Sequence, residues 1–150
     1  MTAVTDIFRG RLEFCVRHMS TDYKELAAWQ RSMDLVREVY RSTRSFPREE
    51  LFGLGSQMRR AAVSVPSNIA EGKGRYSQKE LIQFLYKARG SLMEPETQTI
   101  IARDLDYLTE KTSQTLSTRT LEVIRILNGL INHFQQELPN LESLVVQSLL

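Results

Sequence analysis

The chain has 150 residues, of which 41% are hydrophobic and 25% charged, and this length and composition suit one domain whose core needs neither disulfides nor a metal. Cys15 is the single cysteine, so an intramolecular disulfide is excluded. No apolar run approaches the roughly 20 residues of a membrane span. Charged residues interrupt the N-terminus where a signal peptide would be apolar. We therefore expect a cytoplasmic protein without a membrane partner, and the net charge of +2 is too small to identify any other partner.

Residues 1–18 show no sustained periodicity and are predicted to be a weakly structured leader, so that the functional protein starts at Met19. A helical pattern follows and ends at Phe46-Pro47, because the residue before a proline avoids the helical conformation. Its apolar residues recur every three or four positions and predict one buried stripe, formed by Leu26, Trp29, Met33, Val36, Tyr40 and Thr43.

A second helix is predicted from about Leu54 to Glu71, with Leu54, Met58, Ala61, Ala62, Val65 and Ile69 facing inward. Its outward arc is unusually small and apolar, and the only charges between Leu54 and Ala70 are Arg59 and Arg60. Because a surface helix of a monomer normally has a polar outer face, we expect this helix to pack on two sides. The outward residues predicted to form an oligomer interface are Val63, Pro66, Ser67 and Ala70.

Ser77 and Glu80 form a capping box that opens a third helix. Its predicted inward residues are Leu81, Phe84, Leu85, Ala88 and Leu92, and it should continue to about Leu108 with a kink at Pro95. A fourth helix is predicted to begin within residues 111–117 and to end before Pro139, which leaves residues 139–150 as a C-terminal tail. Four amphipathic helices with short connections predict an all-α four-helix bundle over residues 19–138.

The sequence lacks the motifs of the common chemistries of this fold. A di-iron bundle uses paired Glu-x-x-His motifs, but Cys15 and Leu130 stand three residues before the two histidines. The glycines around Lys73 do not have the spacing of a phosphate-binding loop. We expect no metal, no cofactor and no catalysis, and we interpret the remaining candidate carboxylate ligands as surface groups: Glu71, Glu80, Glu94 and Glu96.

Charge is distributed unevenly along the chain. Residues 45–90 carry eight bases and four acids, whereas residues 91–150 carry four bases and eight acids. Such asymmetry is typical of a nucleic-acid-binding face or of charge-steered self-assembly, and it also occurs on ordinary solvated surfaces. No aromatic residues interleave with the bases, so we expect contacts mainly to phosphates with little sequence specificity. The candidate nucleic-acid-binding residues are Arg59, Arg60, Lys73, Arg75, Lys79, Lys87 and Arg89.

Several segments closely resemble the 23S rRNA intervening sequence protein family, whose superfamily includes accessory proteins of diversity-generating retroelements. The central segments are FPREELFGL at residues 46–54 and QMRRAAVSVPSNIAEG at residues 57–72, supported by AWQ at residues 28–30 and ARGSL at residues 88–92. The resemblance covers about residues 23–138. Two positions depart from the family pattern: Pro95 replaces a leucine, and Asp106 replaces a glycine that often ends the third helix.

The resemblance implies an up-and-down bundle that assembles as a homopentamer, a basic surface proposed to contact nucleic acid, and no catalytic activity. The leading interpretation is therefore a non-enzymatic oligomer that binds RNA or DNA. The alternative is a structural or protein-interaction scaffold, such as an accessory to a reverse transcriptase, and the apolar outer arc of the second helix favours it. An enzyme remains a third alternative.

Overall fold

The computed structural model of the chain describes residues 22–149, with side chains described to residue 138. The predicted leader and the start at Met19 lie outside the described residues. Within the described range there is no strand, as predicted. The helices are α2 (Ala27–Ser42), α3 (Leu54–Lys73), α4 (Gln78–Ser91), α5 (Met93–Asp104) and α6 (Glu110–Leu149), with short 3-10 turns η1 (Tyr23–Glu25), η2 (Thr43–Ser45) and η3 (Arg48–Glu50).

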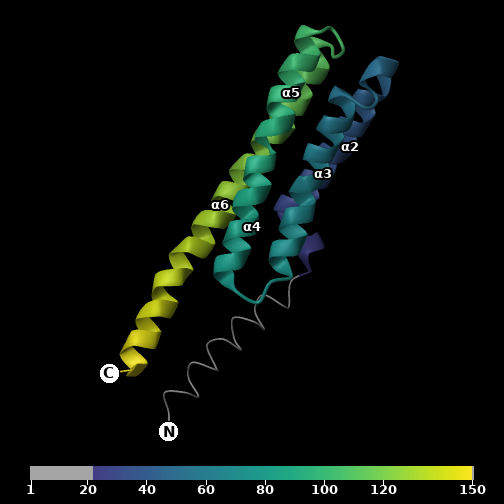
Figure 1. The fold of residues 1–150 in the computed structure, drawn as a ribbon. Coiled ribbons are helices and arrows are strands. Elements are labelled where there is room, and N and C mark those ends of the chain that lie inside the picture. The colour runs from purple at the N-terminus through teal and green to yellow at the C-terminus, as the bar shows by residue number, and fades with distance from the viewer. Residues whose placement is uncertain (1–21, 150) are drawn as a thin grey trace.

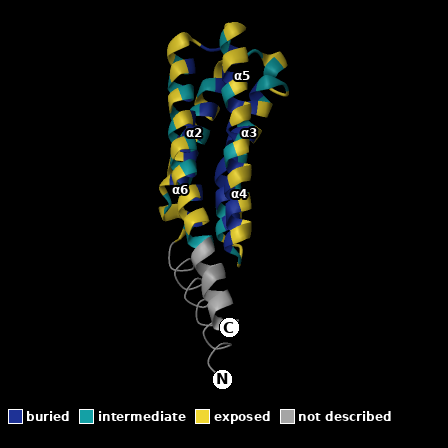
Figure 2. Cartoon of the chain, turned by 90° about the vertical axis from the view of Figure 1, so that its left-hand side faces the viewer, coloured by how far each residue is buried: buried dark blue, intermediate teal, exposed yellow. Residues whose placement is uncertain are grey.

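The helices form an up-and-down four-helix bundle in which α4 and α5 together make the third column (Figure 1). Helix α3 packs against α2 and α4, and α6 packs against α2, α4 and α5. Figure 2 shows the buried positions of these helices turned toward one another and the exposed positions on the outside. The predicted fold class is confirmed.

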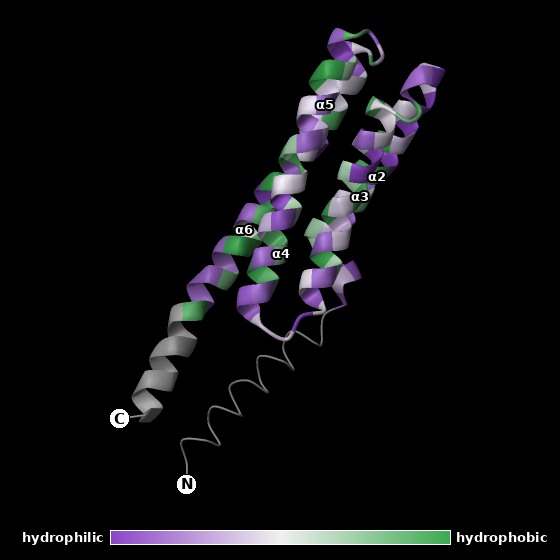
Figure 3. Cartoon of the chain, viewed as in Figure 1, coloured by the Kyte–Doolittle hydropathy of each residue, from purple (hydrophilic) through white to green (hydrophobic). Residues whose placement is uncertain are grey.

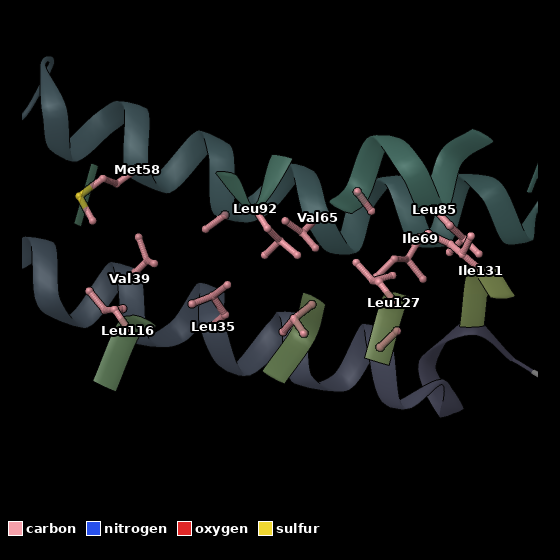
Figure 4. Packing of buried hydrophobic residues seen from close by; sticks show 14 of the residues in the cluster. Leu35, Val39, Met58, Val65, Ile69, Leu85, Leu92, Leu116, Leu127 and Ile131 are labelled. Carbon is pink, nitrogen blue, oxygen red and sulfur yellow. The ribbon is translucent and has the colours of Figure 1, made fainter. Parts of the chain in front are cut away.

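The core runs along the whole bundle. Leu35, Met58, Leu85 and Leu127 come from four different helices and are completely buried (Figure 4). The inward face predicted for α3 is confirmed, since Met58, Ala61, Ala62, Val65 and Ile69 are all buried.

The buried face predicted for α2 is wrong, because the helix is rotated about its own axis relative to the prediction. Its buried residues are Ala28, Ser32, Leu35 and Val39, whereas Tyr40 is 43% exposed. The small Ala28 and Ser32 let neighbouring helices approach closely, and the Ser32 hydroxyl donates to the Trp29 carbonyl oxygen at 2.8 Å. Its burial therefore leaves no unsatisfied hydroxyl, and the larger aromatic residues lie at the edges of the stripe.

The third column bends near the predicted proline. Helix α4 ends at Ser91 and α5 begins at Met93, so the break is at Leu92, three residues before Pro95. Pro95 has no N–H to donate to the carbonyl of Ser91, and its ring crowds that carbonyl. Leu92 keeps a right-handed helical backbone, which makes the break a bend rather than a change of direction.

The connection from α5 to α6 uses a left-handed residue. Asp106 has φ 60°, which is uncommon for any residue other than glycine. The Tyr107 N–H donates to the Ala102 carbonyl at 2.8 Å, and the Asp106 N–H donates to the Arg103 carbonyl at 2.9 Å. This is the Schellman arrangement, so the aspartate adopts the conformation that a helix-ending glycine would favour.

Helix α6 is longer than predicted at both ends. It begins at Glu110, and the Thr109 hydroxyl accepts a hydrogen bond from the Thr112 N–H at 3.2 Å, as an N-terminal cap does. The prediction that it ends before Pro139 is wrong, because its backbone stays helical to Leu149. Pro139 removes one backbone hydrogen bond, as Pro66 does within α3.

Candidate nucleic-acid interface

The seven basic candidates do not form one surface. Arg59 and Arg60 lie near the beginning of α3, and Arg89 lies on the side of α4 that faces α6. Three of the other four lie where α3 ends and α4 begins, and Lys87 lies further along α4. We call this group the basic end: Lys73, Arg75, Lys79 and Lys87.

The turn between α3 and α4 fixes the basic end. The Gly74 N–H donates to the carbonyls of Ala70 and Glu71, both at 3.1 Å, and closes α3. The Ser77 hydroxyl then accepts from the Glu80 N–H at 3.3 Å and opens α4, which confirms the predicted cap. The connection is therefore a short hydrogen-bonded turn that holds its side chains in place.

Phe84 joins the two helices of the basic end. The Arg75 guanidinium lies 4.9 Å from the centroid of its ring, and the Lys87 ammonium lies 4.3 Å from the same centroid. Arg75 also forms an ion pair with Glu71 one turn earlier. The negative face of an aromatic ring attracts cations, so Phe84 brings together one charge from the turn and one from α4.

The close approach of α3 to Phe84 depends on Gly72. A Cβ atom at this position would lie 2.7 Å from the Phe84 Cβ and 3.2 Å from the Leu81 Cδ1. Phe84 is consequently half-buried against the end of α3, at the edge of the core rather than inside it as predicted.

Gln78 anchors the start of α4 to the opposite helix. Its side chain is buried, and its Nε2 donates to the Phe134 carbonyl oxygen of α6 at 2.6 Å. A buried amide hydrogen-bonded in this way holds the end of α4 in one orientation. The sequence analysis assigned no role to Gln78.

The basic end has an excess of positive charge. The same segment contains two acids, Glu71 and Glu80, so the net charge of the four bases and two acids is +2. Burial lowers the pKa of Lys73 from its usual value of 10.5, so this ammonium loses its proton more readily than that of an exposed lysine.

Arg59 is held inside the protomer. Its Nε donates to the Thr43 hydroxyl at 2.8 Å, a terminal nitrogen donates to the Thr43 carbonyl at 3.4 Å, and its guanidinium lies 5.1 Å from the centroid of the Tyr40 ring. These contacts cap the C-terminal end of α2 with a positive charge, where the helix dipole favours one.

Arg89 is also engaged, whereas Arg60 is not. Arg89 donates to the Asn128 side-chain oxygen of α6 at 2.9 Å and lies over the ring of Tyr86. Arg60 is exposed on the outer arc of α3 and has no hydrogen bond or ion pair with any described residue.

Comparison with known proteins identifies the group to which this chain is related. A sequence profile described as 23S rRNA-intervening sequence protein matches residues 24–129. The chain belongs to this family. The resemblance seen in the sequence is confirmed, and the match includes every residue of the basic end.

A solved structure supports the same relationship at the level of the fold. The chain is similar to a protein of unknown function from the S23 ribosomal protein family of Bacteroides thetaiotaomicron, with a TM-score of 0.65 and 19% sequence identity. The similarity covers 70% of this chain and 95% of that one. A comparison with curated proteins gives no match.

The predicted oligomer interface needs one correction. Pro66 is buried within the protomer and does not belong to the outer arc of α3. Val63 is 39% exposed, Ser67 is exposed and Ala70 is half-buried, so these three remain available at the surface.

A second exposed surface lies on α4 and α5, and the sequence analysis missed it. Tyr86 at its start has partners within the protomer, since its hydroxyl accepts from Gln135 at 2.8 Å and its ring lies under Arg89. Its residues recur every three or four positions, are all exposed and include no charge; we call it the outer stripe: Tyr86, Gly90, Met93, Thr97 and Ile100. Figure 3 shows apolar and polar turns alternating along these two helices. The sequence analysis did not find this stripe, because it assigned no core and outer faces to the third helix beyond Leu92.

The sequence analysis also missed the aromatic residues of the basic end. Phe84 was assigned to the core, and Tyr76, which follows Arg75 in the turn, was not considered. Tyr76 is 87% exposed. Only the packing of α4 on α3 brings Phe84 to Arg75, and the spacing of nine residues gives no periodic signal.

Metal and small-molecule sites were also sought in the described part of the chain. Among residues 22–138, no three histidine, cysteine, aspartate or glutamate side chains lie close enough together to hold a metal ion. Two hollows in the same part of the surface have volumes of about 270 and 250 Å³, below the usual range for small-molecule sites. No helix among the described residues is long and apolar enough to cross a membrane.

Proposed function

We propose that this chain is a non-enzymatic cytoplasmic protein that binds RNA or DNA through the basic end. The observation that carries the proposal is the pair of cations at one aromatic ring: Arg75 comes from the turn between α3 and α4, and Lys87 comes from α4 itself. Cations already ordered by the fold lose little conformational entropy when a phosphate binds.

The ion pair of Arg75 does not prevent such binding. Arg75 and Glu71 are both substantially exposed, and exposed pairs of this kind contribute little free energy. A phosphate can therefore replace the carboxylate as the partner of the guanidinium. Arginine can also hold phosphate through two parallel hydrogen bonds, so Arg75 should contribute more than either Lys79 or Lys87.

A charge-matched pair of double variants tests the proposal. Arg75→Ala with Lys87→Ala removes two cations from the basic end. Arg44→Ala with Arg48→Ala removes two exposed cations from the opposite end of α3, about 30 Å away at 1.5 Å per residue. In a mobility-shift titration at low salt, we expect the first variant to bind roughly tenfold more weakly and the second to bind like the unmodified protein. Equal losses in both variants would show that only net charge matters.

We further propose that the chain assembles with copies of itself, as the pentamer that the family resemblance implies. The outer arc of α3 (Val63, Ser67 and Ala70) and the outer stripe are two different surfaces on one protomer. Residues 45–90, which include α3 and α4, carry +4, and residues 91–150, which include α5 and α6, carry −4. Contact between the outer arc of α3 and the α5 part of the outer stripe therefore brings unlike charges together. A contact between two different surfaces closes into a ring when the rotation permits.

Light scattering tests the assembly. Val63→Glu and Met93→Glu place a charge in the two surfaces, and because both side chains are exposed in the protomer, neither should unfold it. We expect both variants to dissociate, whereas Leu51→Glu, at an equally exposed apolar position outside these surfaces, should not. A monomer mass for the unmodified protein would contradict the proposal.

The second candidate function is a protein-interaction scaffold, such as an accessory to a reverse transcriptase. The outer stripe favours it, because an exposed apolar surface without charge is typical of a protein-binding site. The two candidates differ in one result: a scaffold assembles normally but binds no nucleic acid even at low salt.

A further inference from the structure

Tyr76 is the most exposed aromatic side chain near any of the basic candidates. It is 87% exposed and stands in the turn between Arg75 and the capping residue Ser77. Packing within the protomer does not account for an aromatic ring that protrudes this far. Aromatic rings are large apolar surfaces, and burying one against a ligand is favourable.

The surroundings of Tyr76 are basic and rigid. The preceding residue, Arg75, is held at the ring of Phe84 together with Lys87, and the turn is closed on both sides by hydrogen bonds. Tyr76 therefore follows directly in the chain after a cation that is itself held, together with Lys87, at the ring of Phe84.

The opposite end of the bundle provides a contrast. Phe52 is 94% exposed in the connection that precedes α3, but there Glu49 and Glu50 balance Arg44 and Arg48, so that segment has no excess of positive charge. An exposed aromatic residue beside an excess of cations matches the requirements of a nucleic acid, and one in a segment whose charges balance does not.

We propose that Tyr76 is a stacking platform for an unpaired base, so that the basic end takes single-stranded RNA or DNA in preference to a duplex. This inference rests on the proposed function and names its substrate class. A ring can stack on a base only when that base is not already stacked and paired within a duplex, whereas phosphates are available in both forms. It adds base stacking to the phosphate contacts that were expected from the sequence.

Fluorescence anisotropy with the full chain tests the inference. The probes are labelled 12-nucleotide oligouridine, oligothymidine of the same length, and a 12-base-pair DNA duplex, all at low salt. We expect Tyr76→Ala to weaken binding of both single strands by roughly tenfold and to leave duplex binding unchanged. Tyr76→Phe, which keeps the ring, should bind within about twofold of the unmodified protein, because stacking does not use the hydroxyl. The two single-stranded probes show whether RNA or DNA is preferred.

Phe52→Ala is the matched control, since it removes a similarly exposed aromatic ring from the opposite end of the bundle, where the charges balance. It should change neither single-strand nor duplex binding. Both alanine variants should melt like the unmodified protein, because neither ring is packed in the core.

The other possible outcomes distinguish a failure of this inference from a failure of the proposed function. If the unmodified protein binds none of the probes, the proposed function is wrong. If it binds and Tyr76→Ala has no effect, or weakens single strands and duplex equally, stacking is wrong while nucleic-acid binding stands. If Tyr76→Phe loses as much affinity as Tyr76→Ala, or if Tyr76→Ala dissociates the assembly in light scattering, the residue has another role and the inference is overturned.

Discussion

The role of Arg59 follows from its contacts within the protomer rather than from its charge. It was a candidate for nucleic-acid binding, yet its donors are used by Thr43 at the end of α2. A substitution there should weaken the junction of α2 and α3 and leave the basic end intact.

We expect Arg59→Ala to lower the free energy of unfolding by about 2 kcal/mol, since it removes hydrogen bonds made by a charged donor to partly buried acceptors. Affinity for nucleic acid should stay within about twofold of the unmodified protein, as charge at a distant site acts weakly once salt screens it. Urea unfolding and a binding titration on the same sample measure the two quantities. A variant that keeps full stability but binds nucleic acid poorly would show that Arg59 belongs to the nucleic-acid interface.

Asp106 offers a second prediction at the residue scale. Its left-handed backbone costs energy in any residue that has a Cβ atom, although aspartate tolerates it better than most. Asp106→Gly should therefore raise the free energy of unfolding by about 0.5–1 kcal/mol.

The control for this prediction is the same substitution two residues earlier. Asp104 is the last residue of α5, and glycine there should destabilise the protein by up to about 1 kcal/mol. Chemical unfolding of the two variants should thus shift in opposite directions. A loss of stability in Asp106→Gly would mean that the aspartate side chain makes a contribution larger than the relief of backbone strain.

Two glycines test how the helices meet. Gly72 is buried, and a Cβ there would come within 2.7 Å of Phe84, whereas a Cβ at Gly90 would meet nothing within 4 Å. We expect Gly72→Ala to destabilise the protein by about 1–3 kcal/mol through overpacking. Gly90→Ala should stabilise the protomer by roughly 0.5–1 kcal/mol through its better helix propensity.

Gly90 also lies on the outer stripe, so its substitution has a second readout. If copies pack closely there, the added methyl group should weaken the assembly in light scattering while the protomer stays folded. Thermal unfolding that ranks Gly72→Ala above Gly90→Ala would contradict the packing of α3 on α4.

At the scale of whole helices, the sequence predicted what depends on local physics. The cap at Ser77 and the core face of α3 follow from hydrogen-bonding groups and periodicity within a few residues, and both are confirmed. The stripe of α2 was wrong because large aromatic residues were given more weight than Ala28 and Ser32, whose small size decides which face packs closely.

The candidate site could be predicted only in part. The excess of bases around the α3–α4 turn was visible in the sequence, but its division into engaged and available residues was not. Arg59 meets Thr43, and Arg89 meets Asn128, across 16 and 39 residues of chain. Such pairs depend on tertiary packing, as does the position of Phe84 beside Arg75. Local sequence patterns do not predict such contacts between distant residues.

At the scale of the whole assembly, the basic end is repeated in every copy, and this repetition would raise the affinity for nucleic acid. Each copy contributes an excess of +2, and a ring of identical copies would present several such ends to one strand. Linked sites raise overall affinity without any new contact when one strand can reach them together. Assembly and nucleic-acid binding are therefore expected to weaken together in Val63→Glu and Met93→Glu.

The central claim is that Arg75 and Lys87 contact phosphates, and the salt dependence of binding measures this most directly. For a single strand, the logarithm of affinity falls with the logarithm of salt concentration with a slope of about −0.7 for each phosphate neutralised. Replacing both residues by alanine should make the slope shallower by about 1.4 for each pair that contacts the strand, and Arg44→Ala with Arg48→Ala should leave it unchanged. An unmodified protein whose affinity does not depend on salt, or a slope that stays the same after both basic-end residues are removed, would contradict the claim.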